Sequence, residues 1–106
     1  MNKDKLIKEL IFDEGYKTET YEDHLGFLTL GVGNLNWWRN LNDNKQRVMV
    51  NMGFNLGYPR LSKFKKFLDA MQKNDFETAA VEMMDSKWAT QVGKRAERLK
   101  QRVLEK

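Results

Sequence analysis

One segment, residues 44–56, constrains the fold of this chain more than any other. Its apolar residues fall on most sides of the helix that the segment would form, whereas a surface helix carries them along one stripe. A helix that is apolar all round has to be buried, so we expect this one at the centre of a helical lobe. Its apolar residues are Val48, Met49, Val50, Met52, Phe54 and Leu56.

The residues that follow predict shorter helices around this central one. Gly57 is suited to end the central helix, and Pro59 is suited to begin the next. Apolar residues then recur at helical spacing, and Asn74 or Asp75 can cap the second of these stretches. Ser86 can cap a further short helix. The recurring apolar residues are Leu61, Phe64, Phe67, Leu68, Met71, Phe76, Ala79, Ala80, Met83 and Met84.

The N-terminal part of the chain has a different pattern. Residues 4–12 predict an amphipathic helix with one apolar stripe. Between residues 16 and 35, strand-forming residues are punctuated by glycines, which predicts a small, bent antiparallel sheet. Glycine allows the sharp bends that such a sheet requires. The strand formers are Thr18, Thr20, Tyr21, Phe27, Thr29 and Val32, and the glycines are Gly26, Gly31 and Gly33.

These segments predict an α+β fold, in which an N-terminal helix and a small antiparallel sheet pack against a helical lobe. With 106 residues, the chain is expected to be one domain spanning residues 1–106. Residues 1–35 would form the helix and β lobe, and residues 44–106 the helical lobe. A ligand cleft is expected between the two.

Composition limits the kinds of site that the chain can carry. There is no cysteine and only one histidine, His24, so neither a disulfide framework nor a Cys or His metal site is expected. No apolar run approaches the length of a transmembrane helix. The N-terminal apolar residues are interrupted by Lys8 and Glu9, which favours mature protein over a signal peptide.

Charge is distributed unevenly along the chain. Residues 1–59 carry seven Lys or Arg and eight Asp or Glu, whereas residues 60–106 carry twelve and seven. The second half is therefore basic by five charges, and its last helix, over about residues 94–105, would pack Ala96, Leu99 and Val103 inward. An anionic partner such as a wall polymer or a membrane surface is one interpretation, and a solvated surface is the other. No nucleic-acid-binding motif accompanies the charge, so no nucleic-acid partner is expected.

Three polar residues, Glu14, Asp23 and Thr29, form a spaced set, E-x8-D-x5-T, at the end of the first predicted helix and in the glycine-rich segment. Glycosidic bond cleavage needs one acid to protonate the leaving oxygen and one ionised carboxylate to hold a water or face the developing charge. Glu14 stands at a helix C-terminus, where the helix dipole disfavours negative charge, so a functional role is favoured. Alone, Asp23 is typical of a turn and Thr29 of a strand.

Further motifs make the chain resemble the phage-type lysozymes, the endolysin muramidases of glycoside hydrolase family 24. The resemblance begins with Asp-Glu-Gly at 13–15 and Thr-Leu-Gly-Val-Gly at 29–33. It continues with Asn-Met-Gly-Phe-Asn-Leu-Gly at 51–57, Ser-Lys-Trp at 86–88 and Gly-Lys-Arg-Ala-Glu-Arg at 93–98. The matches occur in order and cover most of the chain.

The resemblance implies roles for individual residues. Glu14 matches the catalytic acid of the family, Asp23 its second carboxylate, and Thr29 the hydroxyl that shares the catalytic water. Leu35 and Phe54 match positions that line the sugar cleft. Arg95 matches an arginine that approaches the catalytic glutamate from the C-terminal helix.

The resemblance also implies an activity and its setting. Family members hydrolyse the β-1,4 bond between N-acetylmuramate and N-acetylglucosamine in bacterial peptidoglycan, and they need neither metal nor cofactor. A monomer that does not insert stably into membranes is expected. It would stay in the host cytoplasm, without a signal peptide, and act on the cell wall after release.

The sequence departs from the family pattern at several places. Asn34 stands where the family usually has a histidine, and Phe67 and Glu82 replace small or amide side chains at cleft positions. Only residues 36–43 remain where relatives carry further helices between the lobes, so a shortened cleft floor is expected. Within this stretch, Trp37 and Trp38 can either cover apolar surface or expose an indole for stacking on sugars.

Two other functions remain open. A lytic transglycosylase uses one glutamate and leaves a 1,6-anhydro sugar, but it has no use for Asp23 and Thr29. A non-catalytic binder would instead hold wall polymer or membrane through the basic C-terminal stretch, residues 94–106, which has the composition of an amphipathic basic helix.

Overall fold

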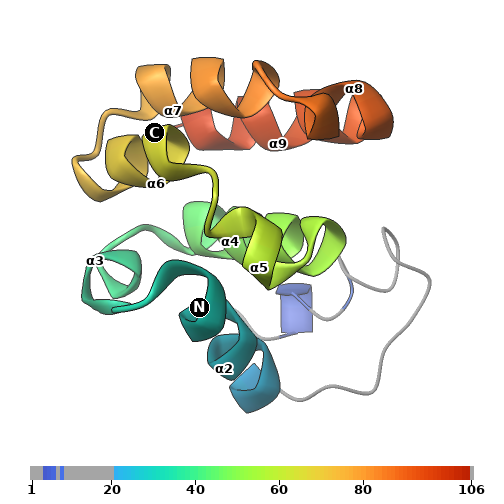
Figure 1. Cartoon of the computed structure of the whole chain (residues 1–106). Coiled ribbons are helices and arrows are strands. Elements are labelled where there is room, and N and C mark those ends of the chain that lie inside the picture. Colours follow the sequence, from blue (N-terminus) through green and yellow to red (C-terminus); the bar gives the residue numbers. More distant parts are fainter. Residues whose placement is uncertain (1–3, 7, 9–20, 106) are drawn as a thin grey trace. The chain divides into compact units, whose positions relative to one another are not determined.

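The computed structural model describes residues 4–6, 8 and 21–105 (Figure 1). The chain divides after Leu61 into two compact units, Met1–Leu61 and Ser62–Lys106. Whether they make up the one predicted domain stays a prediction. The helices are α2 (Tyr21–Val32), α3 (Asn36–Arg39), α4 (Asp43–Leu56), α5 (Tyr58–Leu61), α6 (Lys65–Gln72), α7 (Phe76–Met84), α8 (Lys87–Val92) and α9 (Lys94–Leu104).

The first unit is built around α4, as the sequence predicts. Asn42 caps the start of this helix, because its side chain accepts a hydrogen bond from the backbone N–H of Lys45 at 2.9 Å. Gly57 ends the helix with a positive φ of 94°. α2 and α5 pack against α4. Four of its apolar residues are fully buried, namely Val48, Met49, Val50 and Met52.

The prediction of a β sheet between residues 16 and 35 is wrong for the described part of that segment, and with it the α+β fold class. Tyr21–Val32 is one α-helix, and no strand occurs among residues 4–6, 8 and 21–105. The helix buries Leu28 and ends at Gly33, whose φ is +75° and whose N–H donates to Thr29 O at 2.8 Å. Gly33 therefore terminates a helix rather than bending a strand.

A second glycine of this segment serves helix packing. A Cβ atom at Gly31 would lie only 2.8 Å from the carbonyl oxygen of Tyr58, and one at Gly53 would overlap the Tyr58 ring. Tyr58 is buried and packs against α2 at Gly31 and against α4 at Gly53, two positions where a larger residue would collide with it. Close approach of three helices explains a glycine that the sequence pattern assigned to a sheet.

Reciprocal hydrogen bonds join α3 to α4. Trp38 Nε1 donates to the carbonyl oxygen of Gln46 at 3.2 Å, and Gln46 Nε2 donates to the carbonyl oxygens of Trp38 at 3.1 Å and Arg39 at 3.3 Å. Trp38 is 2% exposed, and Trp37 is half-buried with its Nε1 atom inaccessible. The interpretation that the pair covers apolar surface is therefore confirmed for Trp38.

The second unit consists of α6, α7, α8 and α9, with α7 packed against both α6 and α9. Its caps agree with the sequence, since Asp75 accepts from Thr78 N at 3.3 Å and Ser86 accepts from Ala89 N at 3.2 Å. The chain between α5 and α6 is not helical, so the predicted helix is interrupted: Leu61 belongs to α5, Phe64 to the connection, and Phe67, Leu68 and Met71 to α6. The unit's buried apolar residues are Phe67, Ala70, Met71, Ala79, Ala80, Met83, Trp88, Ala89, Ala96, Leu99 and Val103.

Candidate functional site

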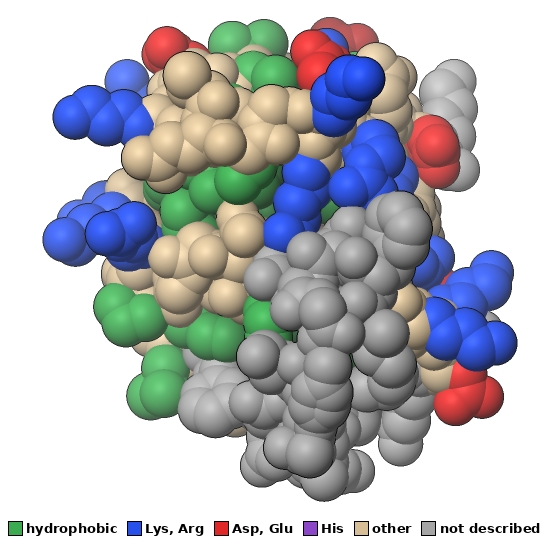
Figure 2. All heavy atoms as spheres, turned by 90° about the vertical axis from the view of Figure 1, so that its right-hand side faces the viewer, with side chains coloured by type: hydrophobic (Ala, Val, Ile, Leu, Met, Phe, Trp, Pro, Cys, Tyr) green, Lys and Arg blue, Asp and Glu red, His purple; other side chains and the backbone are tan. Residues whose placement is uncertain are grey.

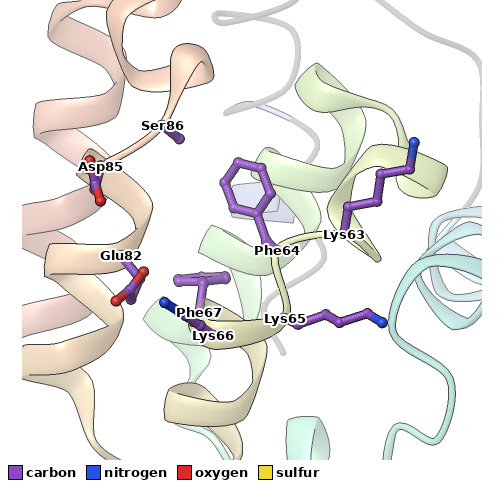
Figure 3. Close-up of a pocket in the computed structure, with 8 residues that line it drawn as sticks. All are labelled: Lys63, Phe64, Lys65, Lys66, Phe67, Glu82, Asp85 and Ser86. Atoms are coloured by element: carbon purple, nitrogen blue, oxygen red, sulfur yellow. The ribbon is translucent and has the colours of Figure 1, made fainter.

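A pocket of about 350 Å³ lies within the second unit (Figure 3). One side is formed by the first turn of α6 and the two residues before it, and the other by the end of α7 and the residues before α8. A volume of this size falls at the lower end of the range for small-ligand sites. The lining residues are Lys63, Phe64, Lys65, Lys66, Phe67, Glu82, Asp85 and Ser86.

Aromatic rings form the apolar part of this pocket. The Phe64 ring meets Phe67 edge to face, with centroids 6.4 Å apart, and meets Trp88 edge to face at 6.5 Å. Phe67 and Trp88 are buried, whereas Phe64 is half-buried. Two fixed rings therefore hold a third that is accessible in the pocket, an arrangement suited to the apolar face of a sugar ring.

Charged side chains stand on both sides of the pocket. Glu82 and Asp85 come from one side, and neither carboxylate has an ion-pair partner within the described part of the chain. Three lysines come from the other side. In Figure 3, Lys66 is directed toward the side of Glu82, whereas the chains of Lys63 and Lys65 extend away from the carboxylates. The pocket can therefore combine stacking with hydrogen bonds from hydroxyl, amide or amine groups of a ligand to the carboxylates.

Ser86 has a structural task. Its Oγ donates to the carbonyl oxygen of Met83 at 2.8 Å and accepts from Ala89 N at 3.2 Å. These are the bonds of a helix cap at the start of α8. The Ser86 hydroxyl therefore shapes the pocket edge rather than acting as an activated nucleophile, which would need an adjacent base.

The sequence-predicted catalytic residues fall in the first unit. Glu14 lies outside the described residues. Asp23 lies in α2, and Thr29, exposed on the same helix, donates its hydroxyl to Leu25 O at 2.9 Å. Asp23 and Thr29 are six residues apart, which on a helix separates them by about 9 Å along the axis and places them on different faces. The geometry of α2 alone therefore does not bring the two positions together. The hydroxyl of Thr29 keeps lone pairs for a water, and its shared water with Asp23 stays a prediction.

The remaining predicted site residues are divided between the units. Leu35 is buried just before α3, and Phe54 is half-buried near the end of α4. Arg95 is half-buried in the first turn of α9. The predicted contact between Arg95 and Glu14 stays a prediction, as do the cleft roles of Leu35 and Phe54.

Two residues noted only as departures from the family pattern prove to be neighbours. Phe67 and Glu82, fifteen positions apart in sequence, line the same pocket from opposite sides. Phe64, Asp85 and the three lysines were not predicted as pocket residues. The Phe-Lys-Lys-Phe run at residues 64–67 was the available signal, since it places two aromatic rings one helical turn apart.

The described residues offer neither a metal site nor a membrane span. No group of three or more His, Cys, Asp or Glu side chains among them is arranged to hold a metal ion. None of the described helices has the length and apolar character needed to cross a membrane.

Comparison with known proteins supports a lysozyme-like origin. The chain is 37% identical over 62 residues to "Probable T4-type lysozyme 2" of Dictyostelium discoideum. The match covers 58% of this chain and 36% of that protein, so the chain spans about a third of the relative's length. No family model matches the chain, and no solved structure matches it significantly. The similarity supports a relationship between the matched part of this chain and the lysozymes.

Proposed function

We propose that this protein is a muramidase that hydrolyses the β-1,4 bond between N-acetylmuramate and N-acetylglucosamine in bacterial peptidoglycan. The observation that carries the proposal is the 37% identity over 62 residues to a probable lysozyme. The ordered motifs of the sequence and a pocket with an accessible aromatic ring support it. In this proposal the protein is a monomer that waits in the host cytoplasm and reaches the wall after release.

Glu14 is the general acid in the proposed reaction, and it protonates the glycosidic oxygen as the bond to the sugar breaks. Asp23 stays ionised and, with the Thr29 hydroxyl, positions a water on the opposite face of the sugar. That water gives a proton to Asp23 as it attacks, so the product has the inverted configuration at the anomeric carbon. No metal or cofactor enters this scheme.

The pocket of the second unit has a binding role in this proposal. A pyranose ring would stack on Phe64, and its hydroxyl or amide groups would donate hydrogen bonds to Glu82. The second unit carries eleven Lys or Arg residues against seven Asp or Glu. Figure 2 shows one face of the chain, on which many Lys and Arg side chains are exposed. This charge would attract the anionic wall before the sugars reach the pocket.

A turbidity assay on permeabilised Gram-negative cells, with mass analysis of the released fragments, tests the proposal. Glu14→Gln keeps the shape of the side chain but cannot donate the proton, so lysis should fall by about two to four orders of magnitude. Glu19 is a neighbouring glutamate outside the E-x8-D-x5-T set, so Glu19→Gln is the matched control and should lyse normally. Undiminished lysis by Glu14→Gln would remove Glu14 from the mechanism. Fragments with 1,6-anhydro ends, lighter by one water, would assign a lytic transglycosylase.

A cationic wall binder without catalysis is the second candidate, favoured by the concentration of charge on α9. This helix carries Lys94, Arg95, Arg98, Lys100 and Arg102. Its apolar residues Ala96, Leu99 and Val103 are buried, so lying in a membrane interface would require α9 to leave the unit. Binding to an anionic polymer needs no such change. Salt-sensitive adhesion to peptidoglycan, with no cleavage of soluble muropeptide oligomers, would establish this binder and refute the enzyme.

A further inference from the structure

A second concave surface of the second unit lies between α7 and α9 and has a volume of about 520 Å³. We call it the α7–α9 groove. Its residues from α7 and the position after it share one side of the helix, at relative positions i, i+3, i+4, i+7 and i+8. The groove is lined by Glu77, Ala80, Val81, Met84, Asp85, Lys100 and Leu104.

The floor of the α7–α9 groove exposes large apolar side chains. Val81 is 65% exposed and Leu104 is 42% exposed. Among the residues whose side-chain exposure is described, only Leu30 is also a large apolar side chain with comparable exposure. Single exposed apolar residues are ordinary on protein surfaces, but two that line one groove indicate a surface that another molecule covers.

The charged residues of the groove indicate the sign of the charge that this other molecule carries. Glu77 and Asp85 stand at the two ends of the apolar row, about 12 Å apart along α7 at 1.5 Å per residue. Neither has an ion-pair partner among the described residues. Lys100, the one cation among the described residues that line the groove, is already paired with Glu97 at 3.0 Å. Counting the residues that the structure describes, this groove therefore carries two negative charges without an ion-pair partner, in a unit whose net charge is positive.

We propose that the α7–α9 groove binds an amphipathic helix of a partner protein, with apolar side chains flanked by Lys or Arg residues two helical turns apart. A helix matches the groove because its own residues i and i+8 are also about 12 Å apart. Its apolar side chains would cover Val81 and Leu104, and its cations would reach Glu77 and Asp85. Recognition of an apolar helix stripe in a groove between helices is a recurrent mode of binding. The same carboxylates repel an anionic wall polymer, which makes it the less favourable ligand for this groove.

The proposal goes beyond the proposed enzymatic function and is tested without an activity measurement. The probe is a stapled helical peptide of about 14 residues, a length at which an unconstrained helix is only marginally stable. It carries two leucines between lysines at i and i+8. A second peptide has glutamates in place of the lysines. Fluorescence anisotropy gives the affinity of each peptide for the full chain, and amide chemical shifts locate the binding.

Binding of the lysine peptide should shift the amides around Val81 and Leu104, and the glutamate peptide should bind more weakly. Neutralising one carboxylate, by Glu77→Gln or Asp85→Asn, should weaken the lysine peptide about two- to five-fold, the range for an exposed ion pair. Reversing both charges, by Glu77→Lys with Asp85→Lys, should make the glutamate peptide the better ligand. Val81→Ser should weaken both peptides.

Leu30→Ser is the matched control, because Leu30 is 76% exposed and lies in the other unit. It should leave both affinities unchanged. The proposal is overturned if the two peptides bind equally well, if neither binds, or if Leu30→Ser has the effect of Val81→Ser. Self-association of the chain that Val81→Ser abolishes, without peptide binding, would make a second copy the occupant and also overturn it. So would binding to phospholipid vesicles that depends on Val81 in the absence of peptide binding.

Discussion

Replacing Gly53 by alanine should destabilise the protein, although the same change at most exposed helix positions is stabilising. Gly53 lies inside α4, where the Cβ of an alanine would be 2.6 Å from Cδ1 of Tyr58. Carbon atoms attract each other best at about 3.5–4.0 Å, so the ring would have to retreat by roughly 1 Å. Tyr58 has little room to do so, since it is 8% exposed and its backbone already lies against Gly31.

The magnitude follows from two opposing effects. Glycine in a helix interior is about 0.5–1 kcal/mol less favourable than alanine, which favours the substitution. Forcing an extra methyl group into a packed core costs about 1–3 kcal/mol, which opposes it. Gly26 supplies the control, because it lies inside α2 with nothing within 4 Å of an added Cβ. Gly26→Ala should therefore stabilise, and the two variants should differ in unfolding free energy by about 1–3 kcal/mol.

Urea unfolding followed by far-UV circular dichroism measures both variants under the same conditions. Combining Gly53→Ala with Tyr58→Ala should cost less than the sum of the single changes, because the overlap disappears with the ring. Equal stabilisation by Gly26→Ala and Gly53→Ala would refute the reasoning, since it would mean that Tyr58 does not restrict the space beside Gly53.

Two further predictions concern the second unit. Hydrogen bonds from the hydroxyl and the backbone N–H of Thr78 lower the pKa of Asp75. The ionised Asp75 carboxylate therefore stabilises the fold at pH values above the ordinary carboxyl pKa, and this stabilisation is lost as the pH falls through the lowered pKa. Thermal unfolding between about pH 6 and pH 2 should therefore show a smaller acid-dependent loss for Asp75→Asn than for the wild type, and identical profiles would contradict this. Leu99→Ala, at a position 2% exposed in α9, should lower the unfolding free energy by about 2–5 kcal/mol, measured by urea unfolding. The exposed Gln101 of the same helix is the control, and Gln101→Ala should change stability by no more than about 0.5 kcal/mol.

The helices after residue 42 could be predicted from the sequence because their signals are local. The apolar residues of α4 fall on most of its sides, and Val48, Met49, Val50 and Met52 are buried. α7 and α8 begin directly after Asp75 and Ser86, the residues predicted to cap them. Capping depends on hydrogen bonds that span three residues, so a sequence window contains all of the relevant information. The inward face of α9 follows from helical spacing for the same reason.

The segment before residue 36 could not be predicted because its glycines have two possible uses. In the predicted sheet, Gly31 and Gly33 would bend a strand. In the structure, Gly31 leaves room for Tyr58, and Gly33 ends α2. Only the tertiary contact between α2 and α5 distinguishes these uses, and Tyr58 is 27 positions from Gly31. The pocket was hidden in the same way, since Phe67 and Glu82 meet only through the packing of α6 against α7. The roles of Glu14, Asp23 and Thr29 stay predictions.

Each unit contains a buried tryptophan, so tryptophan fluorescence can follow the unfolding of each unit separately. Trp38 is 2% exposed in the first unit, and Trp88 is 5% exposed in the second. Trp37→Phe with Trp88→Phe leaves an indole only in the first unit, and Trp37→Phe with Trp38→Phe leaves one only in the second. The fluorescence emission of each double variant is followed during denaturant unfolding, and its midpoint is corrected for the effect of the substitutions on stability. If the two corrected midpoints coincide, the units unfold as one cooperative body. Separate transitions would show that each unit can persist while the other opens.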